Sequence, residues 1–232
     1  VTPRLRAAGH DVYTPTLTGL GERRHLARPD VDLDTHIQDV DNVLELEDLH
    51  DVVLLGHSYA GAVVPGVADR VPDRIARLVY LDSGPLADGL AFLDIYPPEA
   101  KQHVERQVAE HGDGWRLPVP SWDELENDYD ASLEGLGDAQ RRLFQARAVP
   151  QPFGTYTRPS RRGPARAELP KLLISCSFPL DGVREMIAGG HPWFRELAGP
   201  EWQFLELRTG HWPMLSKPNE LADLLLTIAY TD

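Results

Sequence analysis

The chain has 232 residues and a formal net charge of −13, with 42% hydrophobic and 25% charged residues. This composition is ordinary for a globular protein of one domain, and the acidic balance argues against a nucleic-acid partner, because phosphate binding needs a basic face. No apolar run is long enough to cross a bilayer, and no signal peptide is evident. The single cysteine, Cys176, excludes an internal disulfide and is compatible with a reducing cytoplasm.

The first predicted elements are helical. The opening stretch VTPRLRAAGH predicts a helix that is already under way at the first residue and ends near Gly9. Residues 11–17 (DVYTPTL) are β-branched and aromatic, which favours an extended segment, and glycines follow them. Residues 35–49 carry apolar side chains at helical spacing, which predicts an amphipathic helix.

Two buried strands and a helix come next. Residues 51–56 (DVVLLG) are almost continuously apolar, as is typical of a strand that is buried on both faces. The stretch GAVVPGVADRV predicts a helix with a kink or an early end at Pro65. Residues 74–82 (RIARLVYLD) predict the next buried strand.

The alternation of strands and helices is interrupted and then resumes. Polar helical stretches such as PEAKQHVERQVAEHG, with prolines and tryptophans, predict an inserted helical lid with a return loop. The segments KLLISCSF and WQFLELRTGHW then predict strands, and KPNELADLLLTIA a closing helix. Such alternation predicts an α/β fold, a mostly parallel central sheet with helices on both faces. We expect a single domain, with the core in 1–83 and 169–232 and the lid in 84–168.

The stretch LLGHSYAGA presents a serine where a buried strand turns directly into a helix. Such a turn is tight and needs small neighbours, which Gly56, Ala60 and Gly61 provide. Ligands bind at the carboxyl ends of parallel strands, so Ser58 is predicted to be a nucleophile. The backbone N–H of Tyr59 is then expected to stabilise an oxyanion. The alternative is that Ser58 only caps the helix, but capping does not require small residues on both sides.

A serine hydroxyl needs a base, and His211 follows the last predicted strand on the same rim. The order serine, acid, histidine is the one expected with such a turn. His57, beside the serine but on the opposite side of the backbone, is interpreted as structural. No histidine stands at metal-ligand spacing from Cys, Asp or Glu, so no metal is predicted. The remaining histidines are expected to be solvated in helices or loops: His10, His25, His36, His50, His103, His111 and His191.

The motifs GHSYAG, RLVYLDSGPLADG and TGHWPMLSKPNELADLLL resemble those of the α/β-hydrolase superfamily. The similarity is greatest to the small esterase branch that includes plant methylesterases and hydroxynitrile lyases, with actinobacterial relatives. The resemblance implies a serine esterase that cleaves a small-molecule carboxylic ester through an acyl-enzyme, without a cofactor. The family usually has Gly where this chain has Ala60, which is still small.

The resemblance leaves two candidates for the acid of the triad. The family's acid usually follows the strand that here reads LLISCSFPLDG, but the aligned position holds Phe178 and Pro179. Asp181 lies nearby and serves if the loop is shifted, although DG is also a common turn. Asp82 is favoured, because in relatives such as haloalkane dehalogenases the orienting carboxylate comes from the preceding strand. Adjacent strand ends lie about 5 Å apart, so both positions can reach His211.

The resemblance also implies a segment before the first helix. The family's oxyanion loop, of HG type after an early strand, is absent from this chain. About twenty residues, one strand and a loop, are therefore expected upstream. Losing one oxyanion donor costs on the order of a hundredfold in rate. We expect the sequence as given to be unstable or poorly active without that segment.

Substrate class is less well defined by the sequence. Phe92, Trp122 and Trp212 are candidate substrate-binding residues, and the alternative is that the aromatic residues only anchor the lid to the sheet. The expected partner is a small-molecule ester, with no nucleic acid and no membrane, and a homodimer is left open. Two other functions remain as alternatives: a hydrolase-fold binding protein with vestigial catalysis, and a hydroxynitrile-lyase-like enzyme. The latter is disfavoured because Trp212 stands where that chemistry, by resemblance, wants lysine.

Overall fold

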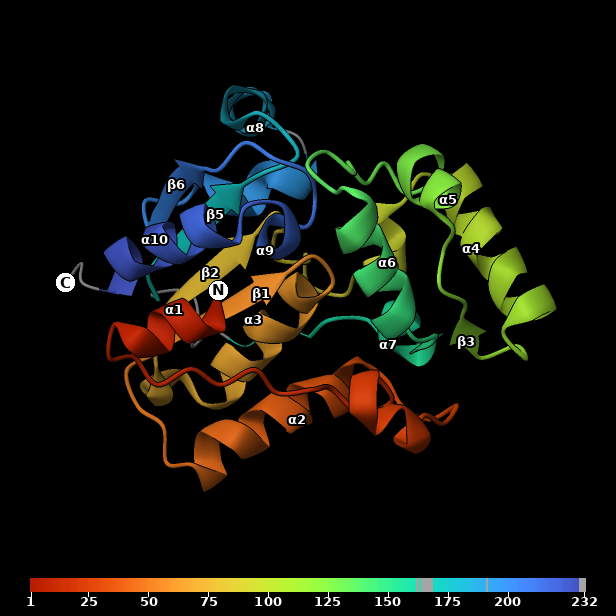
Figure 1. Cartoon of the computed structure of the whole chain (residues 1–232), viewed down its shortest axis with the longest axis horizontal. Coiled ribbons are helices and arrows are strands. Elements are labelled where there is room, and N and C mark those ends of the chain that lie inside the picture. Colours follow the sequence, from red (N-terminus) through yellow and green to blue (C-terminus); the bar gives the residue numbers. More distant parts are fainter. Residues whose placement is uncertain (162, 164–168, 191, 230–232) are drawn as a thin grey trace.

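The computed structural model describes residues 1–161, 163, 169–190 and 192–229. In the described residues, the central sheet has the strand order β1-β2-β5-β6, and each neighbouring pair is parallel. Figure 1 shows these strands between layers of helices, so the predicted α/β architecture is confirmed. The strands are β1 (Val52–His57), β2 (Ile75–Leu81), β5 (Lys171–Ser175) and β6 (Trp202–Glu206).

The alternation of side chains along the strands builds two hydrophobic cores. Leu78 and Tyr80 of β2 belong to the core beneath α2, α3 and α8, whereas Val79 and Leu81 belong to the core beneath α10. Successive residues of a strand point to opposite faces, so a strand that is apolar throughout can bury both faces. The helices concerned are α1 (Thr2–Ala7), α2 (Leu33–Leu46), α3 (Ala60–Arg70), α8 (Leu180–Ala188) and α10 (Pro218–Ala229).

The sequence predicted a kink or an early end of the helix at Pro65, and the early end is wrong. Helix α3 continues through Pro65 to Arg70 without ending early. A proline inside a helix costs about 3 kcal/mol, because one hydrogen bond is lost and its ring crowds the preceding turn. Every residue from Gly61 to Ala68 is buried, and this packing offsets that cost.

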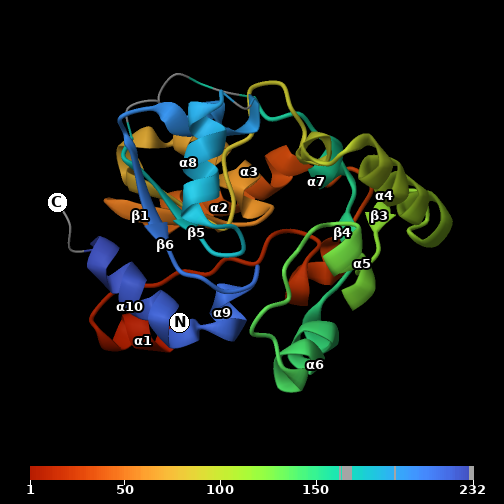
Figure 2. The ribbon, with the colours of Figure 1, turned by 90° about the horizontal axis from the view of Figure 1, so that it is seen from above.

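Residues 84–168, called the insertion from here on, connect β2 to β5. Figures 1 and 2 both show the helices α4 to α7 grouped to one side of the central sheet. The sequence predicted no core strands here, and the described part of the insertion contains only two strands of two residues each, paired antiparallel. Its elements are η3 (Phe92–Ile95), α4 (Pro98–His111), β3 (Arg116–Leu117), α5 (Trp122–Asn127), α6 (Asp138–Arg147), β4 (Gln151–Pro152) and α7 (Gly154–Thr157).

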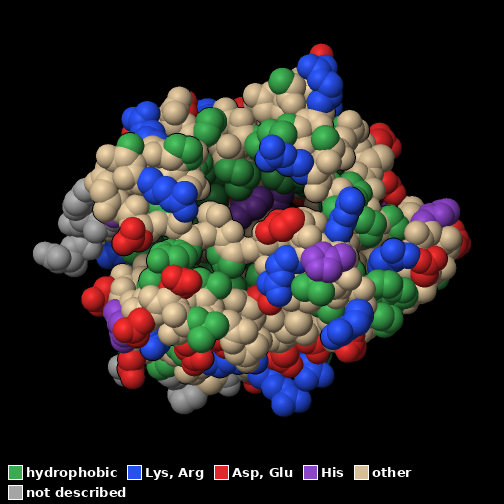
Figure 3. Space-filling view, turned by 60° about the horizontal axis from the view of Figure 1, so that its bottom comes forward, with side chains coloured by type: hydrophobic (Ala, Val, Ile, Leu, Met, Phe, Trp, Pro, Cys, Tyr) green, Lys and Arg blue, Asp and Glu red, His purple; other side chains and the backbone are tan. Residues whose placement is uncertain are grey.

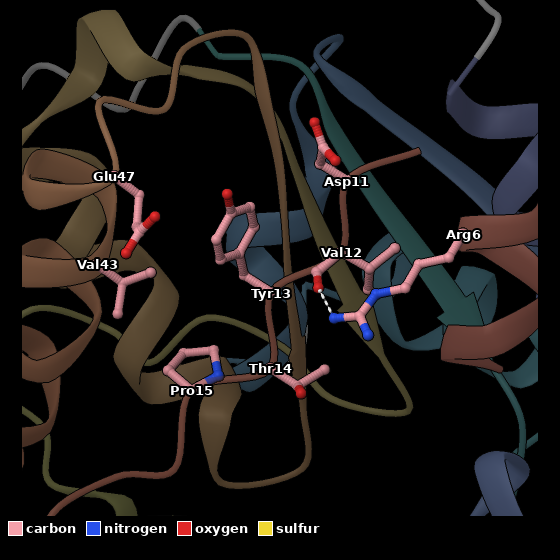
Figure 4. A pocket seen from close by; sticks show the side chains of 8 residues that line it. All are labelled: Arg6, Asp11, Val12, Tyr13, Thr14, Pro15, Val43 and Glu47. Atoms are coloured by element: carbon pink, nitrogen blue, oxygen red, sulfur yellow. Dashed lines mark hydrogen bonds between the residues drawn. The ribbon is translucent and has the colours of Figure 1, made fainter. Parts of the chain in front are cut away.

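Near the N-terminus the predicted short helix is confirmed as α1, and Gly9 follows it with a φ of +93°. Residues 11–17 are not part of a strand. In the described sheet β1 pairs only with β2, so residues 11–17 do not extend the sheet beyond β1. This segment borders a hollow beside α2, which Tyr13 and Val43 both line (Figure 4). At the same hollow Arg6 donates to the Val12 carbonyl.

Shorter elements complete the described chain, and none of the described helices is long and apolar enough to cross a membrane. Helix α9 directly follows the segment that carries His211 and leads into α10. The 3₁₀ helices lie in connections between the main elements. These elements are η1 (Gly21–Leu26), η2 (Pro72–Arg74), η5 (Pro192–Ala198) and α9 (Pro213–Ser216).

Candidate active site

Ser58 occupies a tight turn between β1 and α3. Its φ is +51°, a conformation that costs roughly 1–3 kcal/mol for a residue other than glycine and is concentrated at functional sites. A Cβ on Gly56 would lie 2.6 Å from the Ala60 carbonyl oxygen, and one on Gly61 would collide with Ser83 Oγ. The small residues predicted around Ser58 are therefore a steric requirement of this turn.

His211 lies beside Ser58, although 153 residues separate them in sequence. Its Nε2 is 2.8 Å from Ser58 Oγ, and its Nδ1 is 2.7 Å from Asp82 Oδ2. A carboxylate can only accept, so Nδ1 carries the ring proton, and Nε2 is free to accept the Ser58 hydroxyl hydrogen. The structure thus brings the predicted serine, histidine and favoured acid into one hydrogen-bonded line.

Asp82 sits at the carboxyl end of β2 with a φ of +45° and a completely buried side chain. Its Oδ1 accepts the N–H groups of Cys176 and Ser177 at 2.8 and 2.9 Å, and its Oδ2 accepts the Ser177 hydroxyl at 2.6 Å. Burial alone would raise the pKa of Asp82, but hydrogen bonds from His211 and Ser177 outweigh it and hold the pKa below its ordinary value. The carboxylate therefore stays ionised at neutral pH.

The other candidate acid is not brought to His211. Asp181 lies in the first turn of α8, where its side chain is 82% exposed and bonded to Arg184 at 3.2 Å. Its interpretation as a turn residue is also wrong, because α8 begins at Leu180 and includes the DG pair.

The residue after Ser58 is anchored in the core. Tyr59 precedes the first turn of α3, where backbone N–H groups have no partner within the helix. Its hydroxyl lies 2.9 Å from Nδ1 of His36, whose Nε2 lies 2.9 Å from the Thr18 carbonyl oxygen. His36 is fully buried, so the expectation that it is solvated is wrong. Burial lowers the pKa of His36, which leaves the ring neutral and able to accept from Tyr59.

The other histidine beside the serine also has a specific contact. Nε2 of His57 lies 2.6 Å from the His211 carbonyl oxygen, and the two rings are 4.8 Å apart. The sequence placed His57 on the far side of the backbone from the reacting groups, whereas the structure packs it against the His211 segment. Burial and the neighbouring His211 lower the pKa of His57 to about 4, so its ring is neutral at pH 7.

The remaining histidines differ in environment. His103 is half-buried, and its Nε2 lies near carboxylate oxygens of Glu124 and Asp128. One possible metal-ligand atom from each of the three residues lies within 4.8 Å of the others. Packing of α4 on α5 creates this cluster of possible metal ligands, which sequence spacing did not reveal. These side chains already pair with each other. His10 is half-buried, and His191 lies outside the described residues. The exposed histidines are His25, His50 and His111.

The predicted substrate-binding aromatic residues pack against different parts of the site. The Trp212 ring is 5.1 Å from the His211 ring and 5.5 Å from Phe144, which in turn lies 5.1 Å from Trp122. Trp122 thus packs α5 against α6 and the His211 segment, as an anchor of the insertion would.

Phe92 of the insertion packs instead on the Tyr59 ring, at 5.5 Å between centroids. One face of the molecule is hollowed, with histidine side chains at the floor and both hydrophobic and charged side chains around its rim (Figure 3). An apolar hollow with a few polar groups inside it is the usual form of a small-molecule site.

Comparisons with known proteins match this chain over almost its whole length. Residues 2–224 match the model of the Alpha/beta hydrolase family. A carbendazim hydrolyzing esterase from Nocardioides sp. is 35% identical over 241 residues, which cover 97% of this chain and 90% of the relative. A pyrethroid hydrolase from Sphingobium wenxiniae is 29% identical over 237 residues, which cover 99% of this chain and 81% of the relative.

A solved structure is also similar over the whole chain. It is an extracellular alpha/beta-hydrolase from a Paenibacillus species, with a TM-score of 0.78 and 26% identity. The match covers 99% of this chain and 92% of that one. That protein is described as sharing structural and functional homology with tobacco salicylic acid binding protein 2.

Proposed function

Because the chain belongs to the alpha/beta hydrolase family, we propose that it is a carboxylic-ester hydrolase that uses Ser58 as its nucleophile. The observation that carries the proposal is the hydrogen-bonded line from Ser58 Oγ through the His211 ring to Asp82. This line supplies what a serine needs to attack a carbonyl group: a base within reach and a group that orients the base. The esterase and hydrolase relatives support the reaction class.

Acylation begins when His211 Nε2 takes the Ser58 hydroxyl proton and Oγ attacks the ester carbonyl carbon. The carbonyl electron pair moves to its oxygen, which the Tyr59 N–H stabilises. When the tetrahedral intermediate collapses, the bond to the alkoxy oxygen breaks and His211 gives its proton to that oxygen. The alcohol leaves, and the acyl group remains on Ser58.

Deacylation repeats these steps with water. His211 takes a proton from the water, whose oxygen attacks the acyl carbon, and the Tyr59 N–H again stabilises the oxyanion. The bond to Oγ then breaks, His211 returns the proton to Ser58, and the carboxylic acid is released. Asp82 stays ionised throughout and stabilises the imidazolium form of His211.

The surroundings of His211 support a small ester with an apolar or aromatic group. Trp212 lies directly beside His211, and Phe92 packs on Tyr59, next to Ser58. The named relatives act on carbendazim and on pyrethroids, which supports small-molecule substrates for this chain as well. In this proposal Trp122 anchors the insertion, and the insertion acts as a lid over the site.

Hydrolysis of p-nitrophenyl acetate and p-nitrophenyl butyrate by the purified protein tests the proposal. We expect Ser58→Ala to reduce kcat about 10⁴-fold or more, because the nucleophile is lost. Ser121→Ala is the matched control, since Ser121 caps α5 in the insertion and its loss affects stability alone. A Ser58→Ala variant that keeps the activity of the unmodified protein would contradict the assignment.

A further inference from the structure

Both hydrogen-bonding groups of the His211 backbone are held by distant parts of the chain. The His211 N–H donates to the Ser132 carbonyl of the insertion at 2.8 Å. The His211 carbonyl accepts from Nε2 of His57 at 2.6 Å. The preceding Gly210 N–H donates to the Glu134 carbonyl at 3.1 Å. The segment that carries His211 is therefore clamped between the insertion on one side and β1 on the other.

The clamp on the β1 side is tied to the central sheet. His57 is the last residue of β1 and pairs in register with Leu81 of β2, so each stands one residue before Ser58 and Asp82 respectively. A carbonyl oxygen can only accept, so the proton of the neutral His57 ring lies on Nε2 and is donated to His211. The hydrogen bond from His57 therefore fixes the His211 backbone relative to β1 and β2, the same two strands that carry the nucleophile and the acid.

The clamp matters because the segment around His211 has no regular structure of its own. His211 lies between the end of β6 and the start of α9. Asp82 holds one edge of the imidazole, but a shift of the His211 backbone would strain that hydrogen bond and move Nε2 away from Ser58 Oγ. A misplacement of about 1 Å at a reacting group can cost about a hundredfold in rate.

We propose that His57 is a positioning residue of the hydrolase: by holding the His211 carbonyl, it keeps the His211 imidazole within hydrogen-bonding distance of Ser58 Oγ while Asp82 orients the ring. The Ser132 carbonyl holds the opposite side of the same residue. This inference rests on the proposed function for its kinetic test, but not for its structural one.

The kinetic test compares two variants on p-nitrophenyl butyrate. His57→Leu removes the donor, and we expect kcat to fall about 10- to 100-fold with KM changed less than about threefold. His57→Gln places an amide N–H near the Nε2 position, and we expect kcat within about threefold of the unmodified protein. Unchanged kcat in His57→Leu, or equally low kcat in both variants at unaltered melting temperature, would overturn the proposal. If His57→Leu does not fold, His57→Asn replaces it, because its amide is too short to reach the carbonyl.

A proton NMR measurement tests the clamp without any substrate. The Nδ1 proton shared between His211 and Asp82 is expected as a low-field resonance, identified by its loss in His211→Ala. We expect the resonance to persist in His57→Gln and to broaden or vanish in His57→Leu, because the unheld ring exchanges its proton with water. An unperturbed resonance in His57→Leu would overturn the proposal. If the unmodified protein hydrolyses no ester, the proposed function fails, and the resonance still decides the role of His57.

Discussion

The two halves of the site are supported in different ways. Ser58 and Asp82 directly follow the carboxyl ends of the neighbouring parallel strands β1 and β2, and the Asp82 carboxylate has no exposed surface. The His211 side chain is 18% exposed, and its segment is held by the insertion and by His57. The nucleophile and the acid are therefore placed by local chain geometry, whereas the base depends on contacts between residues far apart in sequence.

The largest expected effect separates the two candidate acids. Asp82→Asn removes the charge that stabilises protonated His211, and we expect kcat to fall about 10³- to 10⁴-fold. Asp181→Asn, on the exposed surface of α8, is the control and should leave kcat within about twofold, because exposed charges contribute little. Steady-state hydrolysis of p-nitrophenyl butyrate measures both. Equal activity of the two variants would remove Asp82 from the mechanism.

The second effect concerns stability and pH. The pKa of His57 falls to about 4 in the folded protein, below its unfolded value, so the unfolded chain binds more protons between these values. Stability from this group is fully present above pH of about 6.5 and is lost as the pH falls toward about 4. We expect the unmodified protein to lose about 2–3 kcal/mol more than His57→Gln over that range, measured by urea unfolding. Parallel stability curves for the two proteins would show that His57 is not held neutral.

The third effect tests the insertion side of the clamp. A Cβ on Gly210 would lie 2.5 Å from the Glu134 carbonyl oxygen and 2.6 Å from that of Ser132. Gly210→Ala should therefore displace the insertion from the His211 segment and lower kcat about tenfold, with a smaller change in KM. Gly182→Ala in α8 is the control, because a Cβ there meets nothing within 4 Å. Full activity of Gly210→Ala would mean that the base does not need the insertion.

The smallest expected effect concerns stability and comes from Tyr59, the residue after Ser58. Tyr59→Phe leaves Nδ1 of buried His36 without its partner, which should lower the free energy of unfolding by about 1 kcal/mol. Ester hydrolysis should change little, because the Tyr59 N–H remains. Tyr13→Phe, at an exposed side chain, is the stability control. Urea unfolding of both variants measures the difference, and a large loss of activity in Tyr59→Phe would give the hydroxyl a role in the reaction.

The positions of Ser58 and Asp82 could be predicted from the sequence, because the features that place them are local. The apolar runs that became β1 and β2, and the small residues around Ser58, impose their geometry on the neighbouring chain. The choice between Asp82 and Asp181 stayed open because the path of the chain after β5 depends on where α8 starts. That start is set by packing of α8 on the sheet, which the local sequence does not encode.

The contacts of His36 and His57 were missed because their partners lie 23 and 154 residues away in sequence. One signal was available for His36: it stands three residues after Leu33 and beside Ile37, on the buried face of α2. No comparable signal exists for His57, because its partner is a backbone carbonyl, a group that every residue carries. The family predicted from the resemblance is confirmed, because residues 2–224 match the alpha/beta hydrolase family model.

The central claim is that His211 activates Ser58, and labelling with a fluorophosphonate followed by peptide mass mapping tests it most directly. We expect one adduct, on Ser58, that is absent in Ser58→Ala and forms at least about a hundredfold more slowly in His211→Ala. An adduct elsewhere, or Ser58 labelled equally fast without His211, would contradict it.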